Sequence, residues 1–508
     1  MDQPRSLETP LTRRQVLILG GAGLGASTIA FASRARAAGP GGQIVVGTTA
    51  DLDTFDPHRS LNVPNRGAVR SVFETLVTRE EQPLLAAAWE HPSDRVWVLR
   101  LRPGVSFHNG DRFTAESAKF SIDRLMDPNT KSPYAGTLRP IERVEVVDEL
   151  SLRVVTNLPV GNLLEVLAEV EMMSPAHVQA AGADVVKKPV GTGPYTLKTW
   201  VPTEQVVLEA FPRYWGAAPR VATLIFKPIP EASTRVVALR TGEADIVMGV
   251  PPQSVRDVTG SGFQPIRVAA RSVIKIALNL TAPPFNDLRV RQAVNHAVNR
   301  EEIIRVLLDG AGSPANGPLS PLHGGYDPSL PGYAYDPERA RALIAQAGAS
   351  GAKVTFNVTR GRFARDAQVA EAVAAQLGKV GLDVSLNAME FTVWLKAYKQ
   401  AGHGFQIPAN LPNSQRQLTG YFDSRAKAFG WWGYDNAEVN ALLDKAGATT
   451  RREERNRAYA QLARLIRDGA PWIFLYNEQL IYGVRDRVRD WTPRGDDLVL
   501  LAGASVAS

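Results

Sequence analysis

The stretch from residue 89 to residue 125 combines a strand, a tight turn and the start of a helix in one uninterrupted segment. Apolar side chains recur between Val96 and Leu101, which predicts a strand. Asn109-Gly110 then supplies a dipeptide that accepts the positive φ of a tight turn. Thr114 is a favoured N-cap residue, and the apolar positions behind it fall on one helix face (Ala118, Ile122 and Leu125). The segment therefore predicts a β-strand that leads through a turn into an amphipathic helix.

Helix and strand signals alternate along the rest of the chain. Asn299 and Glu302 form a capping-box pattern at the start of a helix, and Asp336-Pro337 opens another. Residues 368–380 are predicted to form a helix, and a strand is predicted after it. Residues 471–484 are predicted to form two further strands. Alternation of this kind favours α/β lobes over a barrel built from hairpins.

Five segments carry a resemblance to a known family. In chain order they are residues 89–125, 189–215, 238–245, 284–300 and 335–348. Together they resemble the family 5 extracellular solute-binding proteins, which are the peptide-, dipeptide- and nickel-binding receptors of ABC importers. Each segment alone would be a weak signal, and the joint order over nearly the whole mature chain makes the resemblance specific.

The resemblance implies an α/β fold, namely a two-lobed, periplasmic-binding-protein-like clam with an inserted extra subdomain in the first lobe. The implied boundaries are 39–268 for the first lobe, about 64–180 for the inserted subdomain, 269–484 for the second lobe, and 485–508 for a return to the first lobe. The chain is expected to cross between lobes near 275–279 and again near 478–484. Hinges of this type let two rigid lobes close around a solute.

Residues 1–38 read as an export signal. Arg13-Arg14 precedes an apolar stretch, which ends before small residues at Ala35 and Ala37 that suit a signal peptidase. This pattern predicts a twin-arginine signal, with a Sec signal containing a chance arginine pair as the alternative. The run from Gly21 to Ala26 fits a dinucleotide-binding fingerprint, but it lies inside the removable segment and follows no strand. We therefore expect an exported protein that works in the periplasm.

Composition excludes several function classes. The whole chain has a formal net charge of +7, part of which belongs to the signal, and no block of Lys and Arg suggests nucleic acid. The absence of cysteine excludes disulfides, thiolate nucleophiles and Cys-ligated zinc. After the signal, no apolar run approaches the length of about 20 residues that a membrane-spanning helix needs. A soluble product is therefore expected, with core burial as its source of stability, and a monomer suits a freely diffusing receptor.

Catalytic and metal-binding patterns are missing from the sequence. There is no G-x-S-x-G motif, and the seven histidines fall into no H-E-x-x-H or comparable ligand spacing. The turn at Gly191 and Gly193 lacks the Lys-Ser/Thr end of a phosphate-binding loop. We therefore expect no enzyme activity, cofactor or metal. An exported hydrolase that uses clustered acids, and a ligand sensor for a membrane receptor, stay open as alternatives.

The segment 405–434 is the predicted ligand site of the second lobe, because it mixes aromatic, amide and arginine side chains without helical periodicity. Its candidate ligand-binding residues are Gln406, Asn410, Asn413, Arg416 and one of Trp431 and Trp432. In the first lobe, Thr49, Asp51 and Tyr134 lie in segments that line the cleft in related proteins. Among the histidines, His403 lies nearest the expected cleft.

One departure from the family pattern bears on the ligand. Peptide-binding members carry a Trp-x-x-Asp-Tyr-Pro-Asp segment whose aspartate can pair with a peptide amine, whereas this chain reads Phe-Gln-Ile-Pro-Ala-Asn over 405–410. The amine-pairing acid is therefore absent at that place, and Arg416 offers a bidentate partner for a carboxylate or phosphate instead. Short peptides lead the expected ligands, followed by an opine, an oligosaccharide or a metal chelate. The expected partners are this ligand and the permease subunits of an ABC importer.

Overall fold

The computed structural model describes residues 41–60, 66–360, 363–398, 403–426 and 431–507. The chain divides into two units, 1–38 and 39–508, and only the second is described here. The predicted export signal lies outside the described residues.

One large mixed sheet runs through the described chain, with the strand order β13-β12-β14-β10-β15-β9-β1-β8-β7-β6 and with β11 paired to β15. Its first-lobe strands are β1 (Gln43–Thr48), β6 (Tyr195–Val201), β7 (Gln205–Ala210), β8 (Thr223–Pro228) and β9 (Ile246–Val247). Its second-lobe strands are β11 (Gly312–Pro314), β12 (Lys353–Thr359), β13 (Asp383–Met389) and β14 (Gly404–Ala409). Two long strands, β10 (Phe263–Leu278) and β15 (Trp472–Arg485), lie between these groups.

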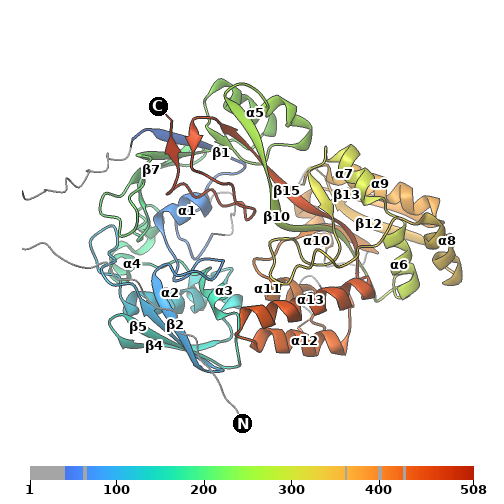
Figure 1. Cartoon of the computed structure of the whole chain (residues 1–508), viewed down its shortest axis with the longest axis horizontal. Helices are drawn as coiled ribbons and strands as arrows, with labels where there is room; N and C mark the ends of the chain where they lie inside the picture. The colour runs from blue at the N-terminus through green and yellow to red at the C-terminus, as the bar shows by residue number, and fades with distance from the viewer. Residues whose placement is uncertain (1–40, 61–65, 361–362, 399–402, 427–430, 508) are drawn as a thin grey trace, which may run out of the picture. The chain divides into compact units, whose positions relative to one another are not determined.

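Strands β10 and β15 join the two lobes. They run side by side and antiparallel, from the pair Phe263–Arg485 to the pair Ala277–Trp472 (Figure 1). Their register shifts between Ala269 and Val273, so the ladder is interrupted where the strands pass from one lobe to the other. The prediction of two strands over 471–484 was wrong, because β15 continues through the whole segment.

A second, four-stranded antiparallel sheet forms the insert of the first lobe. It consists of β2 (Ala86–Ser93), β3 (Val96–Leu101), β5 (Ser151–Thr156) and β4 (Ile141–Asp148). Helix α2 (Ala115–Met126) packs on it and buries Ala118, Ile122 and Leu125. Thr114 caps this helix in a capping box with Ser117, which confirms the predicted helix start.

The remaining first-lobe helices are short. They are α1 (Arg66–Val72), α3 (Leu163–Leu167), α4 (Pro175–Ala181) and α5 (Ala232–Thr241). After β15, the chain forms the small pair β16 (Val488–Arg489) and β17 (Ser505–Val506), and it contributes Val499 and Leu501 to the core around β1.

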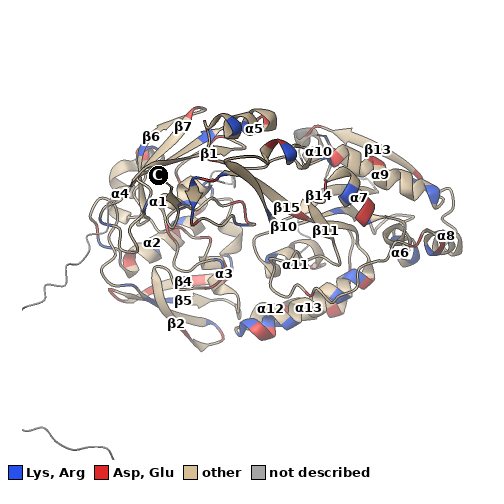
Figure 2. Cartoon of the chain, turned by 45° about the horizontal axis from the view of Figure 1, so that its top comes forward, with Lys and Arg blue, Asp and Glu red and all other residues tan. Residues whose placement is uncertain are grey.

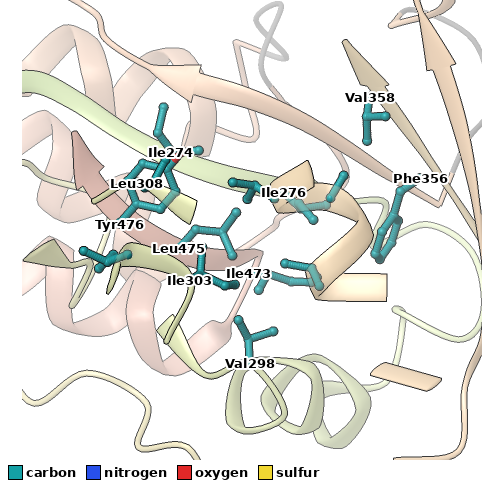
Figure 3. Packing of buried hydrophobic residues seen from close by; sticks show 14 of the residues in the cluster. Ile274, Ile276, Val298, Ile303, Leu308, Phe356, Val358, Ile473, Leu475 and Tyr476 are labelled. Atoms are coloured by element: carbon teal, nitrogen blue, oxygen red, sulfur yellow. The ribbon is translucent and has the colours of Figure 1, made fainter. Parts of the chain in front are cut away.

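Two groups of helices pack against the second-lobe strands. The first group is α6 (Leu288–His296), α7 (Arg300–Leu307), α8 (Pro337–Gln346) and α9 (Asp366–Lys379). Their apolar faces cover Ile276, Ile473 and Phe356 in a continuous core (Figure 3). Asn299 Oδ1 accepts from the Glu302 amide at 3.0 Å, and Asp336 caps α8, so both predicted helix starts are confirmed.

The second group covers the opposite side of these strands. It consists of α11 (Ser414–Phe422), α12 (Ala437–Ala448) and α13 (Arg452–Gly469), while α10 (Phe391–Ala397) packs beside β12. Leu418, Leu462 and Trp472 lie in its core. Basic and acidic residues are mixed along α12 and α13 (Figure 2). None of the helices in the described ranges has the length and hydrophobicity needed to cross a bilayer.

Candidate ligand site between the lobes

A buried charge cluster lies on the first-lobe side of the site. It consists of Arg66, Arg70, Arg79, Glu169, Glu171 and Asp496. Helix α1 places Arg66 and Arg70 one turn apart, Glu169 lies in the turn that follows α3, and Glu171 forms an isolated bridge with Thr75. The guanidinium of Arg79 pairs with Glu169 at 2.6 Å, and that of Arg66 pairs with Glu171 at 2.6 Å. The Glu171 side chain is fully buried, so its charge depends on these arginines.

The C-terminal segment completes this charge cluster. Asp496 Oδ2 lies 2.9 Å from Nη1 of Arg79 and also pairs with Arg494 at 2.6 Å. Burial alone would raise the pKa of Glu169, but the charges of Arg79 and Arg70 outweigh burial and lower this pKa to about 2. The carboxylates are therefore held ionised inside the protein.

Tyr134 borders the charge cluster. Its hydroxyl accepts a hydrogen bond from Nη1 of Arg66 at 2.9 Å, and the guanidinium carbon of Arg66 lies 4.9 Å from the centre of its ring. Burial raises the pKa of Tyr134, so the phenol keeps its proton at neutral pH.

Two arginines approach from the second lobe. Asn413 caps α11 by accepting from the Arg416 amide at 2.8 Å, which fixes the start of the helix that carries Arg416. The Arg416 guanidinium interacts electrostatically with Glu169 and Tyr134, and it makes no hydrogen bond or ion pair with any described residue. Arg271 leaves β10 at the register shift, and its Nη1 donates to the Pro412 carbonyl at 3.0 Å. Its buried Nε has no hydrogen-bond partner in the described chain.

The lobes also meet at a second place. Arg455 of α13 donates to the Gly161 carbonyl at 2.9 Å and pairs with Glu81 at 2.5 Å. The Arg455 side chain is only 1 % exposed, so this contact between the second lobe and the insert excludes water. Two surface hollows of about 450 and 540 Å³, beside α12 and β6, include no residue of the charge cluster.

Comparison with known proteins settles the family. Residues 80–409 match the model of the bacterial extracellular solute-binding proteins, family 5. The chain belongs to this family. The predicted resemblance, the α/β fold class and the role as a solute-binding receptor are thereby confirmed, and members of this family work outside the cytoplasm.

Curated relatives of this family 5 protein include glutathione-binding proteins. GsiB of Pectobacterium atrosepticum is 30 % identical over 460 residues, covering 86 % of this chain and 88 % of the relative. GsiB of Escherichia coli K12 is 27 % identical over 480 residues, with 90 % and 93 % covered.

Solved structures agree in fold. The ABC transporter-associated periplasmic binding protein DppA of Helicobacter pylori, in complex with the peptide STSA, has a TM-score of 0.77 and 26 % identity, with 92 % of this chain and 98 % of that chain covered. AgaA of A. tumefaciens R10, in complex with agropinic acid, has a TM-score of 0.74 at 23 % identity, with 92 % and 99 % covered, and shows a shared fold.

Of the predicted ligand-binding residues in this family 5 receptor, the structure brings Tyr134 and Arg416 together across the lobes. It places Thr49 against Gly249, and it places Asp51 at the β6–β7 hairpin, where its carboxylate accepts from the Thr203 amide at 2.7 Å. These two residues support the end of β1.

The candidates on β14 and beyond it lie in different surroundings. Gln406 is 2 % exposed and pairs across the ladder with Ile276, on the face of the sheet opposite α11. Asn410 is exposed at the end of β14, and Asn413 is the cap of α11. His403 Nδ1 accepts from the Thr355 amide at 3.1 Å and so ties two strands together.

The adjacent tryptophans have different contacts. Trp431 Nε1 donates to the Tyr434 carbonyl at 2.7 Å, while the Trp432 ring meets the Tyr398 ring edge-on at 5.2 Å. The segment between them and α11 includes residues 427–430, which lie outside the described residues.

Sequence reasoning did not identify Arg271, Glu169 and the other members of the charge cluster as site residues. Arg271 lies within a strand and Glu169 follows a short helix, and neither position carries a motif. The detectable signal was the surplus of arginine in a chain of mild net charge, which points to no particular residue.

Proposed function

We propose that this protein is the periplasmic receptor of an ABC importer, that it captures a small, acidic, peptide-like solute between its lobes, and that it delivers this solute unaltered to a membrane permease. In this proposal the protein works as a monomer after export through the twin-arginine route. It needs no cofactor.

The observation that carries the proposal is the electrostatic interaction of the Arg416 guanidinium with Glu169 and Tyr134 of the opposite lobe, at a place where Arg271 is held beside the start of α11. An interlobe site of this kind encloses a solute, and removal of water strengthens each hydrogen bond to it. A cation without a partner at such a place suits a carboxylate, because charge-assisted bidentate pairs are strong and directional. The name of the curated relatives, which refers to glutathione, agrees with a small acidic solute.

The other predicted ligand-binding residues remain part of the proposal. Those proposed as secondary contacts are Thr49, Asp51, Asn410, Asn413, Trp431 and Trp432, whereas Gln406, on the opposite face of the sheet, is proposed only to position β14. The lobe boundaries proposed from the sequence, 39–268 and 269–484 with a return over 485–508, agree with the passage of β10 and β15 between the two groups of strands.

Ligand binding tests this proposal directly. Native mass spectrometry of protein purified without unfolding should detect a retained solute, and calorimetric titration of reduced glutathione should give an affinity. Arg416→Ala is expected to weaken binding of an acidic solute by about 1.5–3 kcal/mol, the range for hydrogen bonds to charged groups. Arg240→Ala, which changes an exposed arginine on α5, is the matched control.

Two results would contradict the proposal. An unchanged affinity of the Arg416→Ala variant would remove this residue from the site. Recovery of a chemically converted solute after incubation with the protein would show turnover and replace the receptor role with an enzymatic one.

A further inference from the structure

The interlobe site carries more positive than negative charge. Five arginines meet three carboxylates in it: Arg66, Arg70, Arg79, Arg271 and Arg416 against Glu169, Glu171 and Asp496. Arg494 at its edge is matched by Glu80, with 3.1 Å between them. The described residues therefore leave an excess of two positive charges between the lobes.

This excess belongs to the second lobe. The three first-lobe arginines each pair with a carboxylate: Arg66 with Glu171, Arg70 with Glu171 and Arg79 with Glu169. In contrast, the Arg416 guanidinium has no hydrogen-bond or ion-pair partner among the described residues, and Arg271 makes a side-chain hydrogen bond only to a carbonyl. Burial lowers the pKa of both groups, yet an arginine stays protonated in proteins. Two half-buried guanidinium groups thus lack an ion-pair partner among the described residues.

The two second-lobe cations converge. Arg271 is anchored to the Pro412 carbonyl, and the next residue, Asn413, caps the helix that carries Arg416. Both guanidinium groups interact with the charge of Glu169. One short segment therefore holds the Arg271 guanidinium and fixes the start of the helix from which the Arg416 side chain extends.

The carboxylates near these two arginines are already paired with other arginines. Glu169 accepts from Arg79 at 2.6 and 3.0 Å, and Asp496 lies between Arg79 and Arg494. Glu165, which also interacts with Arg271, shares Arg455 with Glu81, and burial raises its pKa. Among these residues, each carboxylate is already paired with an arginine, so the ammonium group of a solute would have no free carboxylate to bind. An anionic solute, in contrast, could pair with the guanidinium groups of Arg271 and Arg416.

We infer that the solute is a small diacid, with one anionic group paired to Arg271 and the other to Arg416, and that a free amine contributes little to its recognition. This inference rests on the proposed receptor function. A neutral zwitterionic dipeptide brings only one carboxylate, so it would leave one of the two guanidinium groups enclosed with the solute but without an ion-pair partner, which is costly.

Matched probes separate the charge classes. Calorimetry compares reduced glutathione with its monoethyl ester, which lacks one carboxylate, and N-acetylglutamate with N-acetylglutamine, which differ in the same way and carry no amine. Each diacid is expected to bind at least about 10-fold more tightly than its partner, which corresponds to about 1.4 kcal/mol. Equal affinities within both pairs would overturn the inference.

Variants then assign each anionic group. Arg271→Gln and Arg416→Gln should each lower the affinity for the diacid by about 10- to 100-fold and change the affinity for the monoacid much less. The preference for the diacid over the monoacid should therefore be lost. Arg271→Lys should recover part of it, while Arg240→Gln on the surface of α5 should change nothing. An Arg271→Gln variant that keeps the full preference, with its circular dichroism spectrum unchanged, would remove Arg271 from the site.

One experiment separates a wrong prediction of the diacid from a wrong assignment of the receptor role. Esterification of the solute released from the purified protein counts its carboxyl groups, since each one gains a methyl group. A retained solute with fewer than two acidic groups would overturn the diacid and leave the receptor in place. A protein that retains no solute, and that binds neither the acidic probes nor neutral dipeptides, would contradict both.

Discussion

Lys275 offers a sharp test of the energetics of the second lobe, because its charge is buried beneath α11 without a partner. The side chain is 0 % exposed, and Nζ has no hydrogen-bond partner among the described residues. It lies 4.5 Å from the ring centre of Trp472 and 4.8 Å from that of Tyr421. We predict that Lys275→Met, which keeps the length of the side chain and removes its charge, stabilises the protein at pH 7.

The magnitude follows from the pKa. Burial lowers the pKa of Lys275 from its ordinary value to about 7. Each tenfold change in proton affinity corresponds to about 1.4 kcal/mol, so the buried charge costs about 4 kcal/mol at pH 7. Contacts of the ammonium group with the two aromatic rings favour the charged form, so about 4 kcal/mol is an upper value. The variant should therefore gain up to about 4 kcal/mol in free energy of unfolding.

The pH dependence gives an independent check of the same reasoning. Between pH 7 and about 10.4 the unfolded chain binds more protons at this lysine than the folded protein does, so the stability of the native protein should rise with pH. Urea unfolding at pH 7 and pH 9.5 measures this slope. The Lys275→Met variant should lack the contribution, and Lys445→Met, at an exposed position of α12, should retain it. A variant that is less stable than the native protein at pH 7, with an unchanged slope, would refute the assignment of an unpaired buried charge.

Two further predictions concern buried ion pairs, one between the lobes and one within the first lobe. Arg455→Ala leaves Glu81 and the Gly161 carbonyl without their buried partner, and it should destabilise the protein by about 3–5 kcal/mol in urea unfolding, whereas Arg457→Ala on the exposed face of α13 should have little effect. The lowered pKa of Glu169 stabilises the fold above the ordinary glutamate pKa of about 4.3, and this contribution is lost as the pH falls towards about 2. Acid titration of the Glu169→Gln variant should lack that loss, and a native-like acid profile would argue against the arginine contacts as its cause.

Local features of the fold were predictable because their partners lie a few residues apart. Thr114 caps α2, Asn299 caps α7 and Asp336 caps α8, as the sequence patterns predict. Gly242 ends α5 with φ of 84°, a conformation that glycine adopts without strain. Hydrogen bonds of this range depend on the identity of neighbouring residues and hardly on the rest of the chain.

Features set by strand pairing were harder to predict. The segment 471–484 reads as two strands, but pairing with β10 keeps it as one. Gln406 is a polar residue in a predicted ligand segment, yet its register opposite Ile276 turns it to the face that carries α9. The face of a strand residue depends on register, and register depends on a partner far away in sequence.

By itself, the sequence determined the family, the alternation of helices and strands, the absence of thiol chemistry and the presence of Arg416 in a polar segment. Only the tertiary structure decided that Arg271 and Arg416 converge on Glu169, that the first-lobe carboxylates are already occupied by arginines, and that Lys275 is buried among aromatic rings. The reason is physical: capping and turn chemistry act between neighbours along the chain, whereas the balance of charge in a buried site depends on distances through space that no local pattern contains.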